Sequence, residues 1–278
     1  MSKNIQSAAQ DGDLRKMVAE LGCMTSQVLS AVSRRIPSTA ASSISRDAEA
    51  FPPEMADHLS ALLEALGASE GMFQQRISRI MRLQDVSAET IVDDYIPHLA
   101  HQLGKDWDND ARSFADVTIC SARLATAVRE LSRGWMADGR GDWNAPRIAF
   151  ILPELEQHTL GSTIVASRLR RMGVSVQVMA GRADHDVLEI INRMDFDMIA
   201  ISVSTTDRLE TARKLVKMLR RFAGNLPPLV CGGAFCGDEM ELKAYLDVDH
   251  ITSDPVEALR KCGLMGRVRG NIIDPATS

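Results

Sequence analysis

The second half of the chain alternates between short apolar runs and amphipathic stretches. The apolar runs predict strands over residues 147–152, 174–179, 198–203, 228–231 and 250–252. Apolar positions at helical spacing predict helices over residues 160–172, 184–194, 207–222, 238–245 and 255–262. Strands that are apolar on both faces and alternate with helices are typical of a parallel sheet covered on both sides. We therefore expect a flavodoxin-like (Rossmann-like) five-stranded α/β domain over residues 146–272.

The first half of the chain shows only helical periodicity. From residue 54 to residue 140 no strand pattern interrupts the helical spacing of apolar positions. Ser69, Ser87 and Ser113 stand where N-caps would open the second, third and fourth of four helices. Short connections between helices favour a four-helix bundle over this region. An amphipathic helix and a Ser-, Ala- and Pro-rich linker make up residues 1–53, as a candidate partner-contact element or a plain packing helix.

Composition narrows the class of protein. A length of 278 residues is too great for one small core and suggests two domains. The net charge of −5 gives no electrostatic reason to expect direct DNA binding without a partner protein. The five cysteines form no paired CxxC motif, so neither a disulfide framework nor a zinc site is expected. The polar N-terminus and the absence of an 18-residue apolar window predict a cytoplasmic protein without membrane contact.

Polar residues and glycines follow three of the predicted strands. His158 lies in the loop after the first strand, Ser202 and Ser204 end the third, and Gly232 and Gly233 end the fourth. Because the carboxyl ends of parallel strands meet at one edge of a sheet, these residues are expected to share one crevice. Each of them alone has a plain structural interpretation, as a solvated loop side chain, a helix cap or a turn. Their occurrence at three strand ends is what points to a ligand site.

The loop around His158 suits a metal-binding imidazole. A neutral imidazole binds a metal through one nitrogen, and Glu156 can accept a hydrogen bond from the other nitrogen. Gly161 allows close approach to the start of the next helix, and the Gly232–Gly233 pair leaves room beside a long ligand.

These residues resemble the motif of cobalamin-binding domains, which runs Asp-x-His-x-x-Gly, then Ser-x-Leu, then Gly-Gly. The chain has "EQHTLG" at 156–161, "SVS" at 202–204 and "GG" at 232–233. The intervals between the three motifs, the preceding helical bundle and the late "HITSDPVEAL" also resemble this family. Glu156 replaces the usual Asp, and because its longer carboxylate still reaches an imidazole, the carboxylate–imidazole relay is altered rather than lost. Ser204 replaces the usual Leu, which leaves the inference of cofactor binding intact.

The resemblance implies a base-off, His-on cobalamin. His158 would be the lower axial ligand of the cobalt, and the displaced nucleotide tail would lie beside the serines and the glycine pair. The bundle would cap the upper face. The residues implied to hold the cofactor are Glu156, His158, Thr159, Gly161, Ser162, Ser202, Ser204, Thr205, Gly232 and Gly233, with Trp107 and Phe114 from the bundle.

The bundle differs from that of CarH-type light sensors. Those sensors carry a Trp followed, after nine residues, by Glu-His, whereas Trp107 is followed by Val117-Thr118. That position therefore cannot supply an upper axial histidine. His98 or His101 is a candidate upper ligand, with an exposed polar helix position as the alternative. Trp107 and Phe114 have a role in the bundle core as their alternative.

Over the whole chain, the resemblance is greatest to the AerR/PpaA group of photosynthesis-gene regulators of purple bacteria. It rests on the segment 107–131 and on the Glu-x-His form of the motif. It implies a light-responsive antirepressor that binds adenosyl- or hydroxocobalamin and acts on a PpsR/CrtJ-type repressor, with an oligomeric state that depends on light.

Two alternatives stay open: a corrinoid carrier subunit of a methyltransferase system, and a haem-binding sensor similar to the SCHIC module. No enzyme activity is expected of the chain alone, because a catalytic (β/α)₈ barrel needs about 200 residues and none fits before the bundle.

Overall fold

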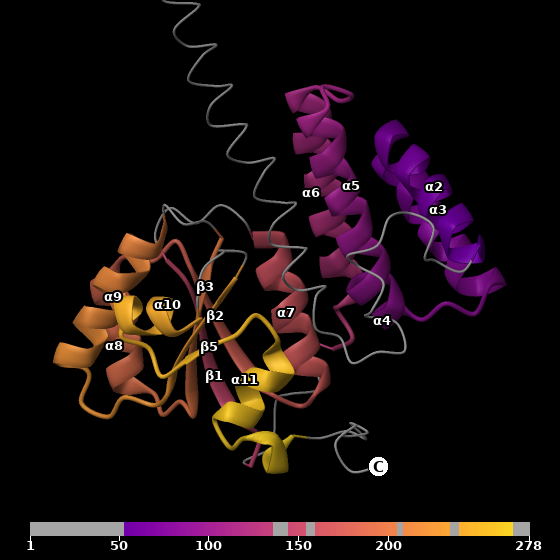
Figure 1. Cartoon of the computed structure of the whole chain (residues 1–278). Coiled ribbons are helices and arrows are strands. Elements are labelled where there is room, and N and C mark those ends of the chain that lie inside the picture. The colour runs from indigo at the N-terminus through magenta and orange to yellow at the C-terminus, as the bar shows by residue number, and fades with distance from the viewer. Residues whose placement is uncertain (1–52, 136–143, 154–158, 205–207, 234–238, 269–278) are drawn as a thin grey trace, which may run out of the picture.

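The computed structural model describes residues 53–135, 144–153, 159–204, 208–233 and 239–268, which form a helical bundle beside an α/β domain (Figure 1). The bundle comprises α2 (Pro53–Ala68), α3 (Glu70–Leu83), α4 (Ala88–Thr90), η3 (Ile91–Tyr95), α5 (Ile96–Asp108) and α6 (Phe114–Leu131). The side chain of Ser69 accepts a hydrogen bond from the backbone N–H of Met72 at 3.2 Å, and that of Ser87 accepts one from Thr90 at 3.1 Å. Ser113 forms a capping box with Asp116. The three predicted N-caps are confirmed.

The third helix of the bundle contains a π-helical turn that the sequence pattern did not predict. In η3, the backbone N–H of Ile96 bonds to the carbonyl of Ile91, five residues back. Pro97 follows at once and has no N–H to give to the carbonyl of Asp93. A wider turn before a proline relieves the clash of its ring with the preceding turn. The apolar spacing survives this irregularity, because Ile91, Tyr95 and Leu99 are all buried.

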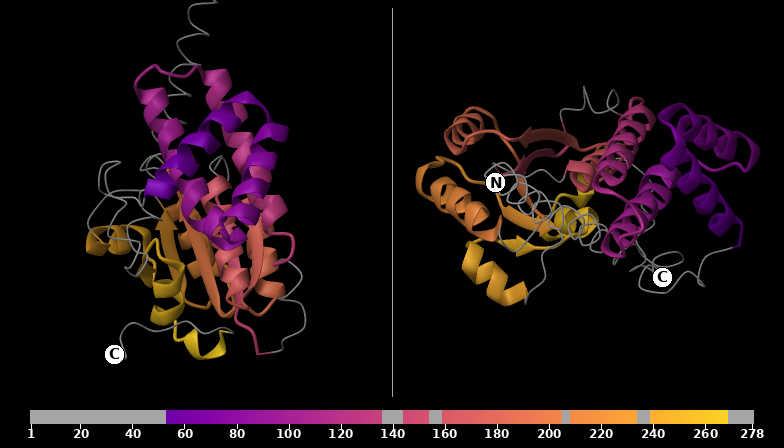
Figure 2. Two further views of the ribbon diagram at one scale, coloured as in Figure 1. Left: turned by 90° about the vertical axis from the view of Figure 1, so that its right-hand side faces the viewer. Right: turned by 90° about the horizontal axis from the view of Figure 1, so that it is seen from above.

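The bundle core extends into the α/β domain through helix α7 (Thr159–Arg171). Ile164 of α7 is 2% exposed and belongs to the same apolar cluster as Leu66 and Leu124 of the bundle. The buried hydroxyl of Ser167 donates to that of Ser132 at 2.9 Å. Seen from above, the bundle lies on the α7 side of the α/β domain (Figure 2). The two parts of the molecule therefore share a packed junction along α7.

The α/β domain is a five-stranded parallel sheet with the order β2-β1-β3-β4-β5. Its strands are β1 (Arg147–Leu152), β2 (Ser175–Ala180), β3 (Met198–Val203), β4 (Leu229–Gly233) and β5 (His250–Ile251). Its remaining helices are α8 (Asp184–Arg193), α9 (Leu209–Phe222), α10 (Glu239–Leu246), α11 (Pro255–Lys261) and the short 3₁₀ helix η5 (Met265–Arg267). The predicted doubly wound fold is confirmed, and the strand order reverses between β1 and β3, where such sheets bind ligands.

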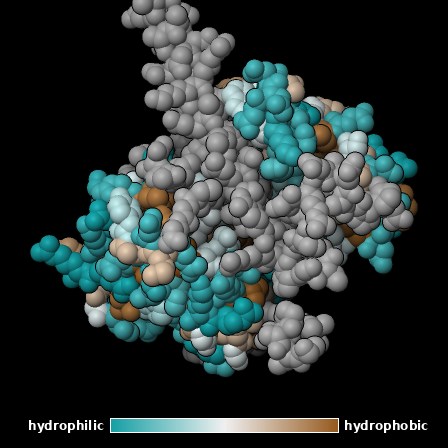
Figure 3. All heavy atoms as spheres, viewed as in Figure 1, coloured by the Kyte–Doolittle hydropathy of each residue, from teal (hydrophilic) through white to brown (hydrophobic). Residues whose placement is uncertain are grey.

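Both faces of the sheet are covered. One face packs against α8, α9 and α10 through residues such as Ile151, Ile201 and Val216. The other packs against α7 and α11 through residues such as Ile148, Leu169 and Leu259. Each fully buried side chain of this kind contributes about 1.5–3 kcal/mol by leaving water. The outer surface over α8 and α9, on the left of Figure 3, is mainly hydrophilic.

Candidate functional site

A pocket opens at the carboxyl edge of the sheet, between α7 and the connection from β5 to α11. Its cavity volume of about 60 Å³ is several times the roughly 10–15 Å³ that one water needs. It lies on the α7 face of the sheet, at the strands beside the reversal of strand order. The lining residues are Phe150, Gly161, Ser162, Val165, Leu169, Met198, Ala200, Ile201, Ser202, Val230, Gly232, Gly233, Thr252, Ser253, Asp254 and Pro255.

Two serines meet at the end of the pocket where β3 ends. The hydroxyls of Ser162 on α7 and Ser202 on β3 lie 3.2 Å apart and share a hydrogen bond. Ser162 is 5% exposed, so this contact replaces hydration that burial has removed. Ser202 points to the α7 face because side chains alternate along a strand, and its neighbours Ile201 and Val203 pack on the other face.

The deeper part of the pocket is apolar. Val165 and Leu169 follow Gly161 at intervals of four residues, so they lie on the same side of α7. The sheet contributes Phe150, Met198 and Val230 from three neighbouring strands. A pocket with hydroxyls at the strand ends and hydrocarbon below them suits a ligand that has both a polar and an apolar part.

The glycine pair is required by the chain's own backbone. A Cβ on Gly232 would overlap the carbonyl oxygen of Thr252, and one on Gly233 would overlap that of Val203. Gly233 also has a φ of +140°, which L side chains rarely adopt. Both glycines line the pocket, as predicted. The prediction was that they leave room for a ligand, whereas the structure shows that a side chain at either position would first collide with the protein's own backbone.

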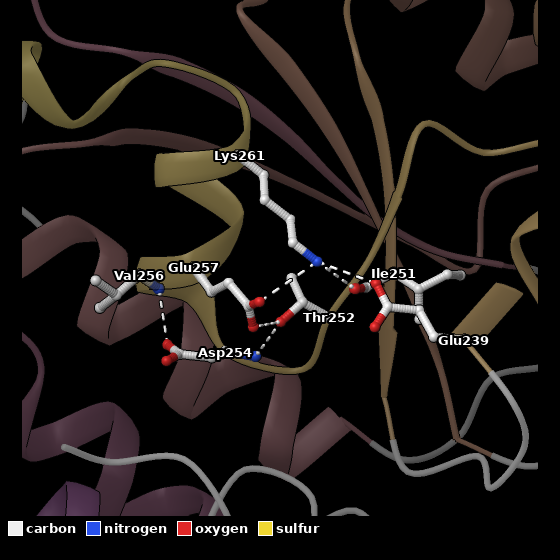
Figure 4. A network of polar contacts seen from close by, with 7 residues as sticks. All are labelled: Glu239, Ile251, Thr252, Asp254, Val256, Glu257 and Lys261. Carbon is white, nitrogen blue, oxygen red and sulfur yellow. Dashed lines mark hydrogen bonds and ion pairs between the residues drawn. The ribbon is translucent and has the colours of Figure 1, made fainter.

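The wall opposite α7 is built from residues 252–255. The carboxylate of Asp254 accepts a hydrogen bond from the backbone N–H of Val256 at 2.9 Å and caps α11. The hydroxyl of Thr252 accepts one from the N–H of Asp254 at 3.2 Å (Figure 4). This connection therefore has a defined shape, set by side chains that bond back to its own backbone.

Comparison of the sequence with known proteins shows which family the chain belongs to. Residues 146–260 match the model of the B12-binding domain. An uncharacterized 20.5 kDa protein in the bchF-crtJ intergenic region of Rhodobacter capsulatus is 36% identical to the chain over 173 residues, which are 62% of this chain and 90% of that protein. The chain belongs to the B12-binding domain family.

The solved structures agree on the fold. The monomethylamine corrinoid protein of Methanosarcina barkeri has a TM-score of 0.58 and 13% sequence identity to this chain. The likeness covers 75% of this chain and 95% of that one, and at this identity it extends to the fold alone. In the part of the chain that the structure describes, no helix is long and apolar enough to cross a membrane.

The structure brings several residues of the B12-binding motif together and leaves others apart. Gly161, Ser162, Ser202, Gly232 and Gly233 all line the one pocket. Ser204 directly follows β3, is only 2% exposed and is not among the lining residues. Thr159 begins α7 at an exposed position outside the lining.

The predicted cobalt ligand His158, its partner Glu156 and Thr205 lie outside the described residues, as does the predicted N-terminal segment 1–52. Their assignments stay predictions. The residues that flank the 154–158 gap are described: Pro153 follows β1, and Thr159 begins α7. Residue 158 is therefore joined directly to the helix that carries Ser162 into the pocket.

The candidate residues of the bundle are half-buried. The Nδ1 of His98 lies 2.7 Å from the carbonyl oxygen of Asp94, and burial lowers the pKa of this imidazole. His101 is also half-buried. Trp107 and Phe114 form an edge-to-face pair with ring centroids 6.4 Å apart, and neither belongs to the buried bundle cluster. Among the described residues, no three His, Cys, Asp or Glu side chains gather into a metal site.

Residues 252–255 belong to the "HITSDPVEAL" stretch of the family resemblance, but they were not predicted to line the site, and the apolar depth of the pocket was not predicted. The signal for the wall was present: Asp254 followed by Pro255 is a helix start, directly after a strand. That order places the three residues before Pro255 at the same carboxyl edge as the serines. The apolar lining carried no such signal, because buried residues such as Met198 and Leu169 look like ordinary core in a sequence.

Proposed function

We propose that this protein holds cobalamin in its base-off form, with the nucleotide tail in the pocket between α7 and residues 252–255. His158 would be the lower axial ligand of the cobalt, and Glu156 would accept a hydrogen bond from its other nitrogen. The pocket is the observation that carries the proposal, because it combines clustered hydroxyls, an apolar depth and a place at the carboxyl edge.

The residues present fit such a tail. The hydrocarbon of Phe150, Leu169 and Met198 suits an aromatic base, and the hydroxyls of Ser162 and Ser202 suit the polar part of the tail. Bound cobalamin would supply a cobalt centre whose upper ligand can be exchanged. The chain's own residues would hold the tail, orient the lower imidazole and restrict access of water to the edge of the sheet.

We further propose that the protein is a cytoplasmic, non-catalytic, light-responsive regulator that relieves repression by a PpsR/CrtJ-type repressor. The support comes from the relative encoded in the bchF-crtJ intergenic region. The packed junction along α7 supports it as well, because α7 touches both the pocket and the bundle. A change of cobalt ligation at residue 158 would act directly on the first turn of that helix.

The cofactor proposal is tested by loading the full chain with adenosylcobalamin or hydroxocobalamin in darkness. We expect an absorption spectrum typical of cobalt with a nitrogen ligand below it. After reduction of the bound cobalt to Co(II) with dithionite, we expect a resonance whose nitrogen splitting changes when histidine is labelled with nitrogen-15. His158→Ala should abolish that splitting, while His185→Ala, on an exposed helix, should keep it. Persistence of the histidine signal in His158→Ala would show that another residue is the lower ligand. His98→Ala and His101→Ala test the upper face in the same way.

The regulatory proposal is tested by illuminating the loaded protein and measuring its mass in solution and its binding to a purified PpsR/CrtJ-type repressor. We expect light to change both. If neither the spectrum nor the association responds to light, the sensor proposal is wrong even where cobalamin binds.

A corrinoid carrier subunit is the second candidate, supported by the fold shared with the monomethylamine corrinoid protein. It predicts that the bound cobalt accepts and returns a methyl group when a methyl-donor protein is supplied. A haem-binding sensor is a variant of the first proposal, and side-by-side reconstitution with haem and cobalamin separates the two.

A further inference from the structure

We propose that Glu257 and Lys261, which do not line the pocket, are positioning residues that fix the 252–255 wall and thereby select corrinoids that carry a nucleotide tail. This inference rests on the proposed function. It concerns the part of the site that a tail would touch and leaves the cobalt ligand aside.

Glu257 binds the side chain of Thr252 from a position outside the lining of the pocket. The hydroxyl of Thr252 donates to Oε2 of Glu257 at 2.5 Å while it accepts from the N–H of Asp254 at 3.2 Å. Figure 4 shows the carboxylate of Glu257 directed at this hydroxyl from the first turns of α11. The residue that Glu257 ties to α11, Thr252, is therefore also one of the residues that line the pocket.

Lys261 ties the same helix to the sheet. Its ammonium donates to the carbonyl of Ile251 at 3.2 Å and to Oε1 of Glu239 at 3.1 Å, and it lies 3.3 Å from Oε1 of Glu257. The Lys261 and Glu257 side chains are 28% and 22% exposed, so water screens this pair less than it screens a surface pair.

The elements on either side of the wall are short. β5 has two residues, and α11 has seven. A helix of that length is marginal by itself, and a two-residue strand adds few ladder hydrogen bonds. The side chains of Glu257 and Lys261 therefore add to the backbone hydrogen bond from the N–H of Thr252 to the carbonyl of Cys231 at 3.0 Å and to the burial of Leu259.

The wall also has little freedom to move without changing the pocket. The carbonyl of Thr252 comes so close to Gly232 that no Cβ would fit between them. Gly232 and Thr252 both line the pocket. One residue therefore faces β4 with its carbonyl and Glu257 with its hydroxyl, so loss of the second contact alters the space beside the first.

If the contacts of Glu257 and Lys261 served only to stabilise the domain, their loss would lower its stability and weaken the binding of every corrinoid alike. A positioning role makes a narrower prediction. Cobinamide has the corrin ring of cobalamin but no nucleotide tail, so it would not use the pocket. Disturbing the wall should therefore weaken binding of cobalamin and leave binding of cobinamide nearly unchanged.

The experiment is a spectroscopic titration of the full-length chain with cobalamin and, separately, with cobinamide. For Glu257→Ala we expect cobalamin affinity about tenfold lower and cobinamide affinity within about twofold of the unaltered chain, with tenfold equal to about 1.4 kcal/mol. Glu257→Gln keeps an acceptor for Thr252, so its cobalamin affinity should lie between that of Glu257→Ala and that of the unaltered chain. Lys261→Met should act in the same direction. The matched control is Glu189→Ala, which breaks an exposed pair of the same i,i+4 spacing with Arg193 on α8.

Three results would overturn the inference. Equal weakening of both corrinoids, together with a lower melting temperature, would assign the network to general stability. Unchanged cobalamin affinity in Glu257→Ala would remove its role altogether. If Glu257→Ala does not fold, then unchanged selectivity in Glu257→Gln and Lys261→Met decides against it. Failure of the unaltered chain to bind either corrinoid would instead refute the proposed function, and the inference would fall with it.

Discussion

Replacing Asp94 by Asn tests the energetics of the junction between the bundle and α7. Asp94 lies in the π-helical turn η3. Burial, reinforced by the neighbouring Asp93 carboxylate, raises its pKa from 3.8 to about 6, against the opposing effect of Arg168 on α7. The Nδ1 of His98 lies 2.7 Å from the backbone carbonyl oxygen of Asp94, which the substitution keeps.

The sign of the effect follows from the two pKa values. The unfolded chain loses this proton near pH 4 and the folded chain near pH 6, so the folded state is penalised progressively over that interval. The full difference of 6 − 3.8 = 2.2 pKa units corresponds to about 3 kcal/mol at 1.36 kcal/mol per unit. Because the side chain still reaches solvent, we expect Asp94→Asn to stabilise the protein by about 1–2 kcal/mol at pH 7. At pH 4 we expect less than about 0.6 kcal/mol, because the folded carboxyl is still protonated and the unfolded one only partly ionised.

The assay is urea unfolding at several values between pH 4 and pH 7, followed by tryptophan fluorescence. Trp135 lies at this junction, with the guanidinium of Arg171 4.4 Å from its ring centroid. Asp93→Asn is the control. It removes the ion-pair partner of Arg171 and should destabilise the protein over the same range, because a largely buried guanidinium is left unpaired. A difference between Asp94→Asn and the unaltered chain that does not change with pH would refute this reasoning.

Two further predictions concern the sheet. Gly233→Ala should prevent the end of β4 from forming and should give a large loss of folded protein by circular dichroism, whereas Gly224→Ala, with open space around it, should fold normally. A normally folded Gly233→Ala would show that the close approach to Val203 can relax. Cys231 should resist alkylation by iodoacetamide at pH 8 in the folded protein, because burial raises the pKa of its thiol to about 12. Rapid modification of Cys231, detected by mass spectrometry, would mean that the strand opens often.

The sequence by itself determined the elements of the fold. Both faces of the sheet must bury apolar side chains, so β1 and β3 appear as continuous apolar runs with the predicted bounds of 147–152 and 198–203. Helix starts were readable because Ser69 and Ser113 cap their own helices through local hydrogen bonds. The motif residues were readable for a related reason: a parallel sheet sends every strand end to one edge.

Only the tertiary structure decided how those elements meet. It paired Ser162 with Ser202 across 40 residues of sequence, left Ser204 out of the pocket, and assigned the glycine pair to contacts with Thr252 and Val203. A local pattern records which side of an element is buried, but not which other element covers it. That choice depends on the strand order and on distances between residues far apart in the chain.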